Sequence, residues 1–387
     1  MGGPRRSVEP GHDKDRPSGR CWEQPAVTRS SSTGVAQTRS VAEPTLDVLT
    51  RHAHNPSAYL ALNEGNLTFE VDGIDGVVIY RPSGRFLIQF GGVFAPPDQQ
   101  AELLTEFVRW ARQNRRRVIS VQLMPEDTDI YLRAGFGVNQ LGASYARSLD
   151  GFSMSGKHFV KIRNKISRAN RDGVRVREVA AVRERTPQLM EALNEVDWVW
   201  LKAKGFGVAE IDFMIGQRGG WAERRRRLFV AEHAGRLVGY QVFSPVFGRH
   251  SGWLHDLSRR IPDAPTGVSE LILSTAVRQF VGEKTPYLHF GLTPFTSLDP
   301  KHRLPGHSPF VDRFVRWLGT RAEWIYPAQS QVAYKLKWQP DLIQPEYVAF
   351  QDGVSLSAVW RLMRVTKAVS LRRGRKSVTR RPASPHE

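Results

Sequence analysis

Three short runs of β-branched, aromatic and aliphatic residues open the hydrophobic pattern of this chain. They cover residues 66–72, 76–82 and 85–92, and turns containing Gly, Asp and Ser separate them, which predicts an antiparallel meander. Apolar residues at helical and then continuous spacing predict a helix, a buried strand, a short helix and a closing strand, over 97–113, 117–124, 127–136 and 138–149. The first half therefore has the predicted order β-β-β-α-β-α-β.

A second series of elements repeats this plan. Its predicted helices cover 157–173, 187–204, 266–282 and 309–320, and its predicted strands cover 174–179, 228–233, 236–246, 251–257, 286–292, 322–326 and 331–338. A turn at Ala234 and Gly235 joins two of these strands as a hairpin. A meander that runs into a helix and then a further strand occurs in both halves, so the pattern predicts an α+β fold of two tandem units with mixed, mostly antiparallel sheets.

The composition of the flanks separates them from these units. Residues 1–42 are rich in Ser, Arg, Gly and Pro and have few apolar clusters, which predicts a disordered leader. The N-terminal unit is predicted over 43–150 and the C-terminal unit over 151–350. Residues 351–387 form a predicted basic tail that ends in LRRGRKSVTRR.

The net charge narrows the class of partner. The 387 residues carry 56 Lys and Arg against 38 Asp and Glu, a formal charge of +18. Such an excess favours polyanions, either nucleic acid or an anionic membrane surface, although an Arg-rich proteome would also produce it. Cys21 is the single cysteine, so an intramolecular disulfide and a cysteine metal cluster are excluded, and we expect no metal site. A reducing cytoplasm fits this composition, and the sequence shows neither a secretory signal nor an apolar run of ~20 residues.

Charged residues gather where the third strand of the second meander ends. This junction carries His255, Asp256, Arg259 and Arg260. The loop that follows, residues 259–267, has two prolines and a single glycine, whereas a coenzyme A cradle needs backbone N–H groups at a Gly-rich turn. We therefore expect no acyl-coenzyme cofactor. Because no Cys or Ser nucleophile motif is present, direct attack by an acceptor on an activated ester is the expected chemistry.

A stripe of cations follows the predicted helix over 157–173. Lys157, Lys161, Lys165 and Arg168 recur at i, i+4, i+8 and i+11. Such a stripe can bind the phosphates of an RNA, and it can equally be a solvated helix face.

Six segments, in the same order along the chain, resemble one family. They are AYLAL (58–62), FSMSGKHFVKIRNKISRANRDG (152–173), GFGVAEIDFMIG (205–216), HDLSRRIPDAPTG (255–267), HFGLTP (289–294) and AYKLKWQPDLIQPEYVA (333–349). The chain resembles the soluble catalytic part of bacterial aminoacyl-phosphatidylglycerol synthases, the lysylphosphatidylglycerol synthetase C-terminal domain family. The resemblance implies two GNAT-like (N-acetyltransferase-like) units, an aminoacyl-tRNA as co-substrate, no cofactor, and transfer of an amino acid to an acceptor.

The resemblance also implies site residues. The family's Asp-Leu-x-Arg motif falls on Asp256 and Arg259, which are the predicted catalytic residues, and a structural ion pair between them is the alternative. Predicted substrate-binding residues are Glu210, Arg260, Lys335 and Lys337, and the predicted tRNA-binding residues are the four of the cationic stripe. A solvated strand face for the two lysines and a helix-start carboxylate for Glu210 remain open. His255, on the other face of its strand, is expected to be a packed core histidine.

One departure from the family bears on the acceptor. Membrane relatives have a Gly-Asp-Pro-x-Gly turn after the third strand of the first unit, whereas Gly91-Gly92-Val93-Phe94-Ala95-Pro96 stands here without the acid. We therefore expect a small soluble hydroxyl, hydroxylamine or amine acceptor, with serine as one candidate amino acid, in antibiotic or other secondary-metabolite biosynthesis. The alternatives are aminoacylation of phosphatidylglycerol at the membrane surface, a non-catalytic RNA-binding protein, and an acetyl-coenzyme A acetyltransferase.

Overall fold

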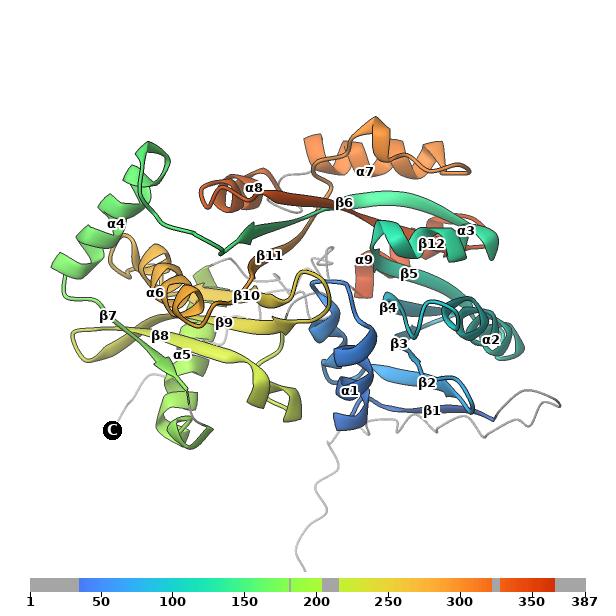
Figure 1. The fold of residues 1–387 in the computed structure, drawn as a ribbon, viewed down its shortest axis with the longest axis horizontal. Coiled ribbons are helices and arrows are strands. Elements are labelled where there is room, and N and C mark those ends of the chain that lie inside the picture. Colours follow the sequence, from blue (N-terminus) through green and yellow to red (C-terminus); the bar gives the residue numbers. More distant parts are fainter. Residues whose placement is uncertain (1–34, 181, 204–215, 322–327, 366–387) are drawn as a thin grey trace, which may run out of the picture.

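The computed structural model describes residues 35–180, 182–203, 216–321 and 328–365, and these build one twelve-stranded sheet with helices on both faces (Figure 1). The strands are β1 (Ala36–Ser40), β2 (Leu67–Val71), β3 (Val77–Ser83), β4 (Phe86–Phe94), β5 (Arg117–Leu123), β6 (Phe136–Ser148), β7 (Arg175–Val179), β8 (Arg227–His233), β9 (Arg236–Val246), β10 (Gly252–Arg260), β11 (Tyr287–Pro294) and β12 (Leu342–Gln351). The α-helices are α1 (Glu43–His52), α2 (Gln100–Gln113), α3 (Thr128–Arg133), α4 (Val160–Arg171), α5 (Pro187–Ala203), α6 (Val268–Gly282), α7 (Pro309–Arg321), α8 (Ala328–Leu336) and α9 (Leu356–Val365).

The sheet shows an equivalent series of strands when it is followed inward from either edge. The order runs β1-β2-β3-β4-β5-β12-β6-β11-β10-β9-β8-β7, so each strand of the first half has a counterpart in the second. The pairs β4–β5 and β10–β11 are parallel, and every other neighbouring pair is antiparallel. A helix, α2 or α6, makes the crossover in each parallel pair, as a parallel connection requires. The predicted α+β fold of two tandem units is confirmed.

The two halves exchange strands at the centre of the sheet. β12, which follows all other strands in the sequence, lies between β5 and β6. β6, from the first half, pairs with β11 of the second half. Each half therefore places one strand next to the parallel pair of the other. Residues 342–350, predicted to belong to the C-terminal unit, complete the sheet of the N-terminal one.

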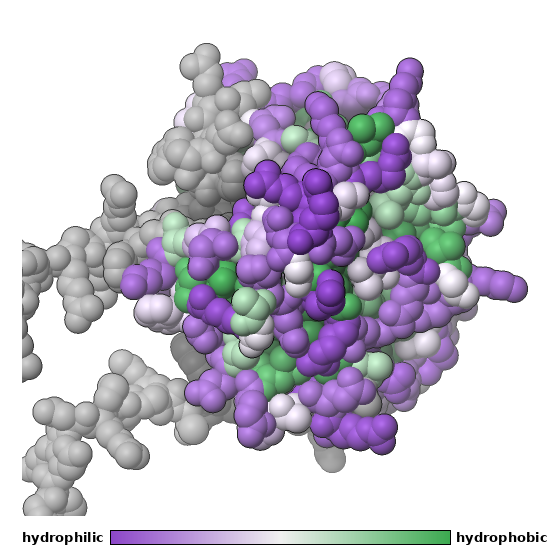
Figure 2. All heavy atoms as spheres, turned by 90° about the vertical axis from the view of Figure 1, so that its left-hand side faces the viewer, coloured by the Kyte–Doolittle hydropathy of each residue, from purple (hydrophilic) through white to green (hydrophobic). Residues whose placement is uncertain are grey.

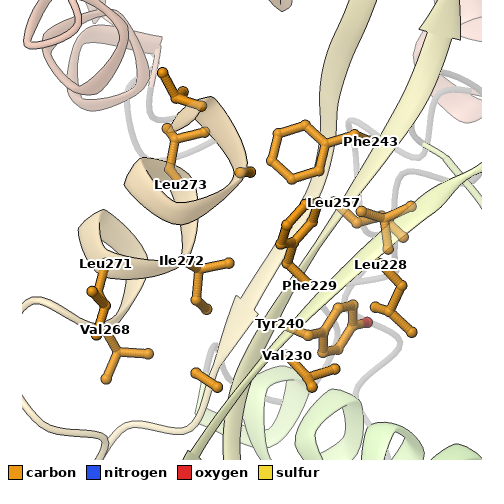
Figure 3. Packing of buried hydrophobic residues seen from close by; sticks show 14 of the residues in the cluster. Leu228, Phe229, Val230, Tyr240, Phe243, Leu257, Val268, Leu271, Ile272 and Leu273 are labelled. Atoms are coloured by element: carbon orange, nitrogen blue, oxygen red, sulfur yellow. The ribbon is translucent and has the colours of Figure 1, made fainter. Parts of the chain in front are cut away.

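The core of the second half lies between its meander and α6 (Figure 3). Alternate residues of β8 and β9 point to one face, and Phe229 and Phe243 meet Phe280 of α6 at ring-centroid distances of 6.0 and 5.1 Å. The hairpin between β8 and β9 turns at Ala234 and Gly235, which both adopt positive φ, as the sequence predicts. This packing holds β10, and with it the predicted site, against a rigid layer.

Three predictions about single segments were wrong. Residues 36–40 of the predicted disordered leader form β1, which pairs with β2. Residues 331–338 were expected as a strand because Val332, Tyr334, Leu336 and Trp338 alternate, but α8 covers most of them. The deeply buried residues of the segment 331–338 are instead Lys335 and Trp338. They are three residues apart, which is helical spacing. Part of the predicted basic tail is helix α9, and the predicted strand over 322–326 lies outside the described residues.

No helix in the described ranges has the length and apolar character needed to span a membrane. The predicted boundary near residue 150 falls just after β6, where the chain turns toward the 3₁₀-helix η3 (Lys157–Phe159) and α4. Residues 1–34 and 366–387, which include the cationic C-terminal run, lie outside the described part of the chain.

Candidate active site

The candidate site lies where β10 separates from β11. The two strands pair only through residues 252–254 of β10, and a bulge between His255 and Leu257 then bends β10 away. A bulge turns a side chain out of the regular alternation, and here the residue at the bulge is Asp256. The strand end that the charge pattern of the sequence predicted as a site is therefore also the place where the sheet opens.

Asp256 is held in a buried polar pocket. Its Oδ2 accepts a hydrogen bond of 2.7 Å from the Ser244 hydroxyl, and its Oδ1 accepts one of 2.6 Å from the backbone N–H of Gly216. Burial raises the pKa of the Asp256 carboxyl, while Arg226 and these hydrogen bonds oppose the rise. A Cβ at Gly216 would lie 1.8 Å from Oδ2, so only glycine allows this close approach.

Arg226 is the partner that the sequence did not reveal. Its Nε lies 3.9 Å from Asp256 Oδ2 and donates to the Ser244 hydroxyl at 3.1 Å. Its Nη2 donates to Asn63 Oδ1 at 3.0 Å, and its guanidinium lies 5.2 Å from the centre of the Tyr59 ring. Tyr59 and Asn63 belong to the first half of the chain, in and just after the 3₁₀-helix η1 (Ala58–Leu62). The AYLAL segment thus supports the site of the second half across the molecule.

Arg259 forms a second ion pair, with Asp197 of α5. Its Nη1 lies 3.0 Å from Asp197 Oδ1, and its guanidinium lies 4.8 Å from the Trp200 ring centre. Asp197 also accepts from the Tyr240 hydroxyl and, at 3.0 Å, from Arg218 Nε. Burial lowers the pKa of Arg259, and Asp197 opposes this. Each predicted catalytic residue therefore has its own partner, Arg226 or Asp197, in place of the ion pair between the two that the sequence left open.

Of the other predicted residues, Arg260 does not join this network. Arg260, one residue beyond Arg259, is exposed, and its Nη1 donates to the Ile261 carbonyl at 3.4 Å. Glu210 lies outside the described residues, within the gap that ends just before Gly216. Gly216, the first described residue after this gap, donates its backbone N–H to Asp256.

Lys335 approaches the site from α8. It is buried, its Nζ donates to the carbonyl of Gly291 on β11 at 2.7 Å, and the Tyr145 ring centre is 5.3 Å away. Burial lowers the pKa of Lys335 to about 7, and Glu346 of β12 opposes the fall. Burial likewise raises the pKa of the fully buried Glu346 to about 7. The charges of Lys335 and Glu346 therefore influence each other near the exchanged strand, although neither a hydrogen bond nor an ion pair joins the two side chains.

The second predicted lysine is different. Lys337 is exposed, and its Nζ lies 5.8 Å from the Tyr334 ring centre. The two lysines do not alternate outward on a strand, because both belong to the helical segment that ends at Trp338, and the helix turns Lys335 inward and Lys337 outward.

His255 packs as the sequence predicts. Its ring lies 5.4 Å from the Phe243 ring and 6.1 Å from the Tyr334 ring. Burial, followed by the nearby Lys335, lowers the pKa of His255 to about 3. A histidine that stays neutral in this surrounding fits the packing role.

The cationic stripe lies on η3 and α4, at the end of the molecule where α4 projects beside α6 (Figure 1). Lys157 and Lys161 are exposed, whereas Lys165 Nζ donates to Glu270 of α6 at 2.6 Å and Arg168 lies 3.8 Å from Asp172. Figure 2, which views this end, shows a mostly hydrophilic surface. Two of the four cations are therefore in ion pairs within the fold.

The start of α6 packs closely against α4. A Cβ at Gly267, the N-cap of α6, would lie 2.2 Å from the backbone carbonyl of Lys165 on α4. The N-cap of α6 therefore lies directly against the backbone of α4, and the expectation of a donor other than an acyl-coenzyme stays a prediction. In the described ranges no group of three His, Cys, Asp or Glu side chains could hold a metal ion.

Comparison with known proteins identifies the fold family. A family model for the C-terminal part of phosphatidylglycerol lysyltransferase matches residues 47–350. The chain belongs to this family. The phosphatidylglycerol lysyltransferase of Bacillus subtilis is 22% identical over 306 residues, which are 76% of this chain and 33% of that protein. The lysylphosphatidylglycerol biosynthesis bifunctional protein LysX of Mycolicibacterium vanbaalenii is 27% identical over 292 residues, 72% of this chain and 26% of that protein. The chain thus spans a third or less of these curated relatives.

Two solved structures share the fold. The C-terminal domain of a lysylphosphatidylglycerol synthetase from Agrobacterium fabrum has a TM-score of 0.69 and 22% identity, covering 85% of this chain and 96% of that one. L-PGS from Bacillus licheniformis has a TM-score of 0.68 and 19% identity, covering 85% and 97%. The family resemblance predicted from the six segments is confirmed, and the family is one of aminoacyltransferase domains, as predicted for the enzyme class.

Proposed function

We propose that this chain transfers an aminoacyl group from an aminoacyl-tRNA to the headgroup of phosphatidylglycerol. The observation that carries the proposal is the pair of buried ion pairs on β10, Asp256 with Arg226 and Asp197 with Arg259, at the point where the sheet opens. Burying charges costs several kcal/mol per ion, so such a cluster at a strand end is more typical of a reaction site than of a stability device.

The proposed reaction is a transesterification. A headgroup hydroxyl oxygen attacks the ester carbonyl carbon, and the bond from that carbon to the terminal ribose oxygen of the tRNA breaks. The proton of the attacking hydroxyl passes to the ribose oxygen, so atoms and charges balance. Because the ester is already activated, orientation and charge stabilisation supply most of the required rate.

The described residues suit these two tasks. Arg259 offers a positive charge for the developing oxyanion, and Asp197 and Trp200 hold its guanidinium in place. Asp256 holds the backbone of Gly216 and lies beside Arg226. Glu210 and Lys335 remain proposed contacts for the aminoacyl group, and Arg260 and Lys337 for the terminal nucleotide. Lys157, Lys161, Lys165 and Arg168 remain proposed contacts for the tRNA backbone.

The lipid acceptor replaces the soluble acceptor as the first choice. The names of the curated relatives refer to phosphatidylglycerol and to lysine, which makes lysine the first amino acid to test. The absence of an acid from the Gly91–Pro96 turn is also a weaker argument against a lipid acceptor than the sequence suggested. Asp127, from the segment after β5, has its carboxyl carbon 3.3 Å from where a Cβ of Gly92 would lie, so an acid stands beside this turn after all. Burial raises the pKa of that carboxyl to about 7.

The test uses the purified full chain with a pool of radiolabelled aminoacyl-tRNAs and phosphatidylglycerol vesicles. Label recovered in the organic extract supports the proposal, and the amino acid that carries it identifies the donor. Loss of that label in Arg259→Gln ties the activity to this site. Deacylation of a tRNA that depends on a water-soluble extract, with no label in lipid, would instead support the soluble acceptor.

A further inference from the structure

Helix α7 presents aromatic rings to solvent. Phe310 and Trp317 are 55% and 48% exposed, and Phe314 between them is half-buried. Their spacing of four and three residues places them on one helix face. The rings stack, with centroids 6.4 Å apart for Phe310 and Phe314 and 6.1 Å apart for Phe314 and Trp317. Two of the three rings are therefore exposed on one helix face, and an exposed apolar patch of this kind marks an interaction surface.

The exposure does not come from a loosely attached helix. The opposite face of α7, with Val311, Val315 and Leu318, is buried, and the two valines lie in a hydrophobic cluster that contains residues of both halves. At the start of α7, Asn139 of β6 donates to the Ser308 carbonyl at 3.0 Å and accepts from the Ser308 N–H at 3.1 Å. At its end, a Cβ at Gly319 would lie 2.1 Å from the Phe295 carbonyl, so the helix approaches that backbone closely.

The charges around the strip are mainly positive. Arg303 and Arg316 both contact Asp312, at 2.8 and 3.1 Å, so two cations share one anion. Arg313, between the rings in the sequence, is exposed and adds a third cation. Aromatic rings beside arginines are the composition of helices that lie in the interface of anionic bilayers, where the rings enter the headgroup layer and the arginines meet lipid phosphates.

We propose that the Phe310–Phe314–Trp317 strip of α7 docks the protein on an anionic lipid bilayer. This inference rests on the proposed function, since it supplies the surface that brings the lipid acceptor to the site. In the sequence, α7 follows β11, whose Gly291 carbonyl accepts from Lys335, and precedes α8, which carries that lysine.

Other occupants fit the strip less well. The ring faces stack on one another, so a nucleic-acid base would have to separate them before stacking. A second copy of the chain would bring two bodies of charge +18 together through arginine-rich surfaces.

The experiment compares the full chain with the double variant Phe310→Ser/Trp317→Ser in vesicle flotation. Vesicles contain either equal parts of phosphatidylglycerol and phosphatidylcholine or phosphatidylcholine alone. The matched control is Trp198→Ser, which removes a tryptophan that is 61% exposed on α5 beside Lys202. We expect the double variant to bind the anionic vesicles at least about tenfold more weakly, and the control to bind within about twofold of the wild type.

Several outcomes would overturn the proposal. These are unchanged vesicle binding by the double variant, equal losses in variant and control, or a loss of tRNA affinity with vesicle binding retained. Loss of dimerisation with vesicle binding retained would assign the strip to a second copy. If the double variant unfolds, as judged by circular dichroism, the exposed change Arg313→Glu replaces it, and unchanged anionic-vesicle binding by that variant overturns the proposal.

A second readout separates this inference from the proposed function. Transfer to phosphatidylglycerol in detergent micelles needs the site but not a bilayer surface, so the double variant should keep it while losing transfer to vesicles. A wild type that transfers to neither form of lipid contradicts the proposed function. The flotation assay still decides on the docking strip in that case.

Discussion

The two parallel strand pairs, β4–β5 and β10–β11, lie near different kinds of buried polar group. At β4–β5 the buried polar groups include neutral ones that satisfy each other. Ser120 donates to Gln89 Oε1 at 2.6 Å, and Gln89 donates to the Gly92 carbonyl at 2.7 Å. At β10–β11 the corresponding strand carries Asp256 and Arg259, each paired with a residue from elsewhere. The same strand order thus surrounds amides in one half and charges in the other.

This difference follows from the cost of burying charge. A neutral amide needs only local hydrogen bonds, so the first half can satisfy its groups within two adjacent strands. A buried ion needs a counter-ion and further hydrogen-bond partners. Arg226 just before β8, Asp197 of α5 and Asn63 just after η1 supply them from distant parts of the sequence. Asp127 is the exception in the first half, and it sits against Gly92 with its pKa raised by burial.

The largest expected effect tests this division directly. Asp256→Asn keeps the shape of the side chain but removes the charge that Arg226 faces, so we expect aminoacyl transfer to fall about 100-fold or more. The control in the first half, Asp129→Asn at an exposed carboxylate, should alter transfer by less than about threefold. Initial rates with labelled aminoacyl-tRNA measure both. Equal losses would show that both halves take part in the chemistry.

The free energy of unfolding should depend more on the ion pairs of the second half than on an exposed ion pair of the first half. Asp197→Asn leaves Arg259 and Arg218 without their buried anion, and we expect the free energy of unfolding to fall by about 3 kcal/mol. The control Asp129→Asn breaks an exposed pair with Arg133 in the first half and should cost no more than about 0.5 kcal/mol. Urea denaturation followed by circular dichroism compares them. A similar loss in both would refute a special role for the buried pairs.

The free energy of unfolding should depend on pH through Glu346 and Lys335, which lie where the two halves join. Because the pKa of Glu346 rises from 4.5 to about 7 on folding, the folded chain binds more protons across this range, and the free energy of unfolding falls as the pH rises through it. Lys335, whose pKa falls from 10.5 to about 7, makes the free energy rise again at higher pH. Glu346→Gln should remove a fall of roughly 2 to 3 kcal/mol between pH 5 and 7. Urea titrations at pH 5, 7 and 9 would reveal an unchanged slope if this assignment is wrong.

The smallest effect concerns the surface. Lys161→Gln removes one exposed cation of the α4 stripe, so we expect tRNA affinity to fall about two- to fivefold and the slope of log affinity against log salt to drop by about 1. Arg133→Gln, exposed on α3 of the first half, should leave both unchanged. Filter binding between low and moderate salt provides the measurement. Matching effects from both variants would mean that the whole cationic surface binds RNA without a preferred track.

Much of the fold could be predicted from local pattern. The meanders, the hairpin turn at Ala234 and Gly235, and helices α2 and α6 follow from periodicity that each segment carries by itself. The charged strand end at Asp256 and Arg259 was also visible, because charges that follow an apolar strand are informative without knowledge of the partners. Residues 331–338 misled the prediction because their apolar residues alternate, although Lys335 is one of the residues that the helix buries.

The sequence by itself determined that two similar units follow one another, that the chain is strongly cationic, and that charged residues gather at the end of one strand. Only the tertiary structure decided that β12 and β6 are exchanged, and that Arg226 and Asp197 are the partners of Asp256 and Arg259. The physical reason is separation along the chain. Arg226 bonds to Asn63, 163 residues away, and no periodicity within one segment can specify a contact that forms only after both halves have folded together.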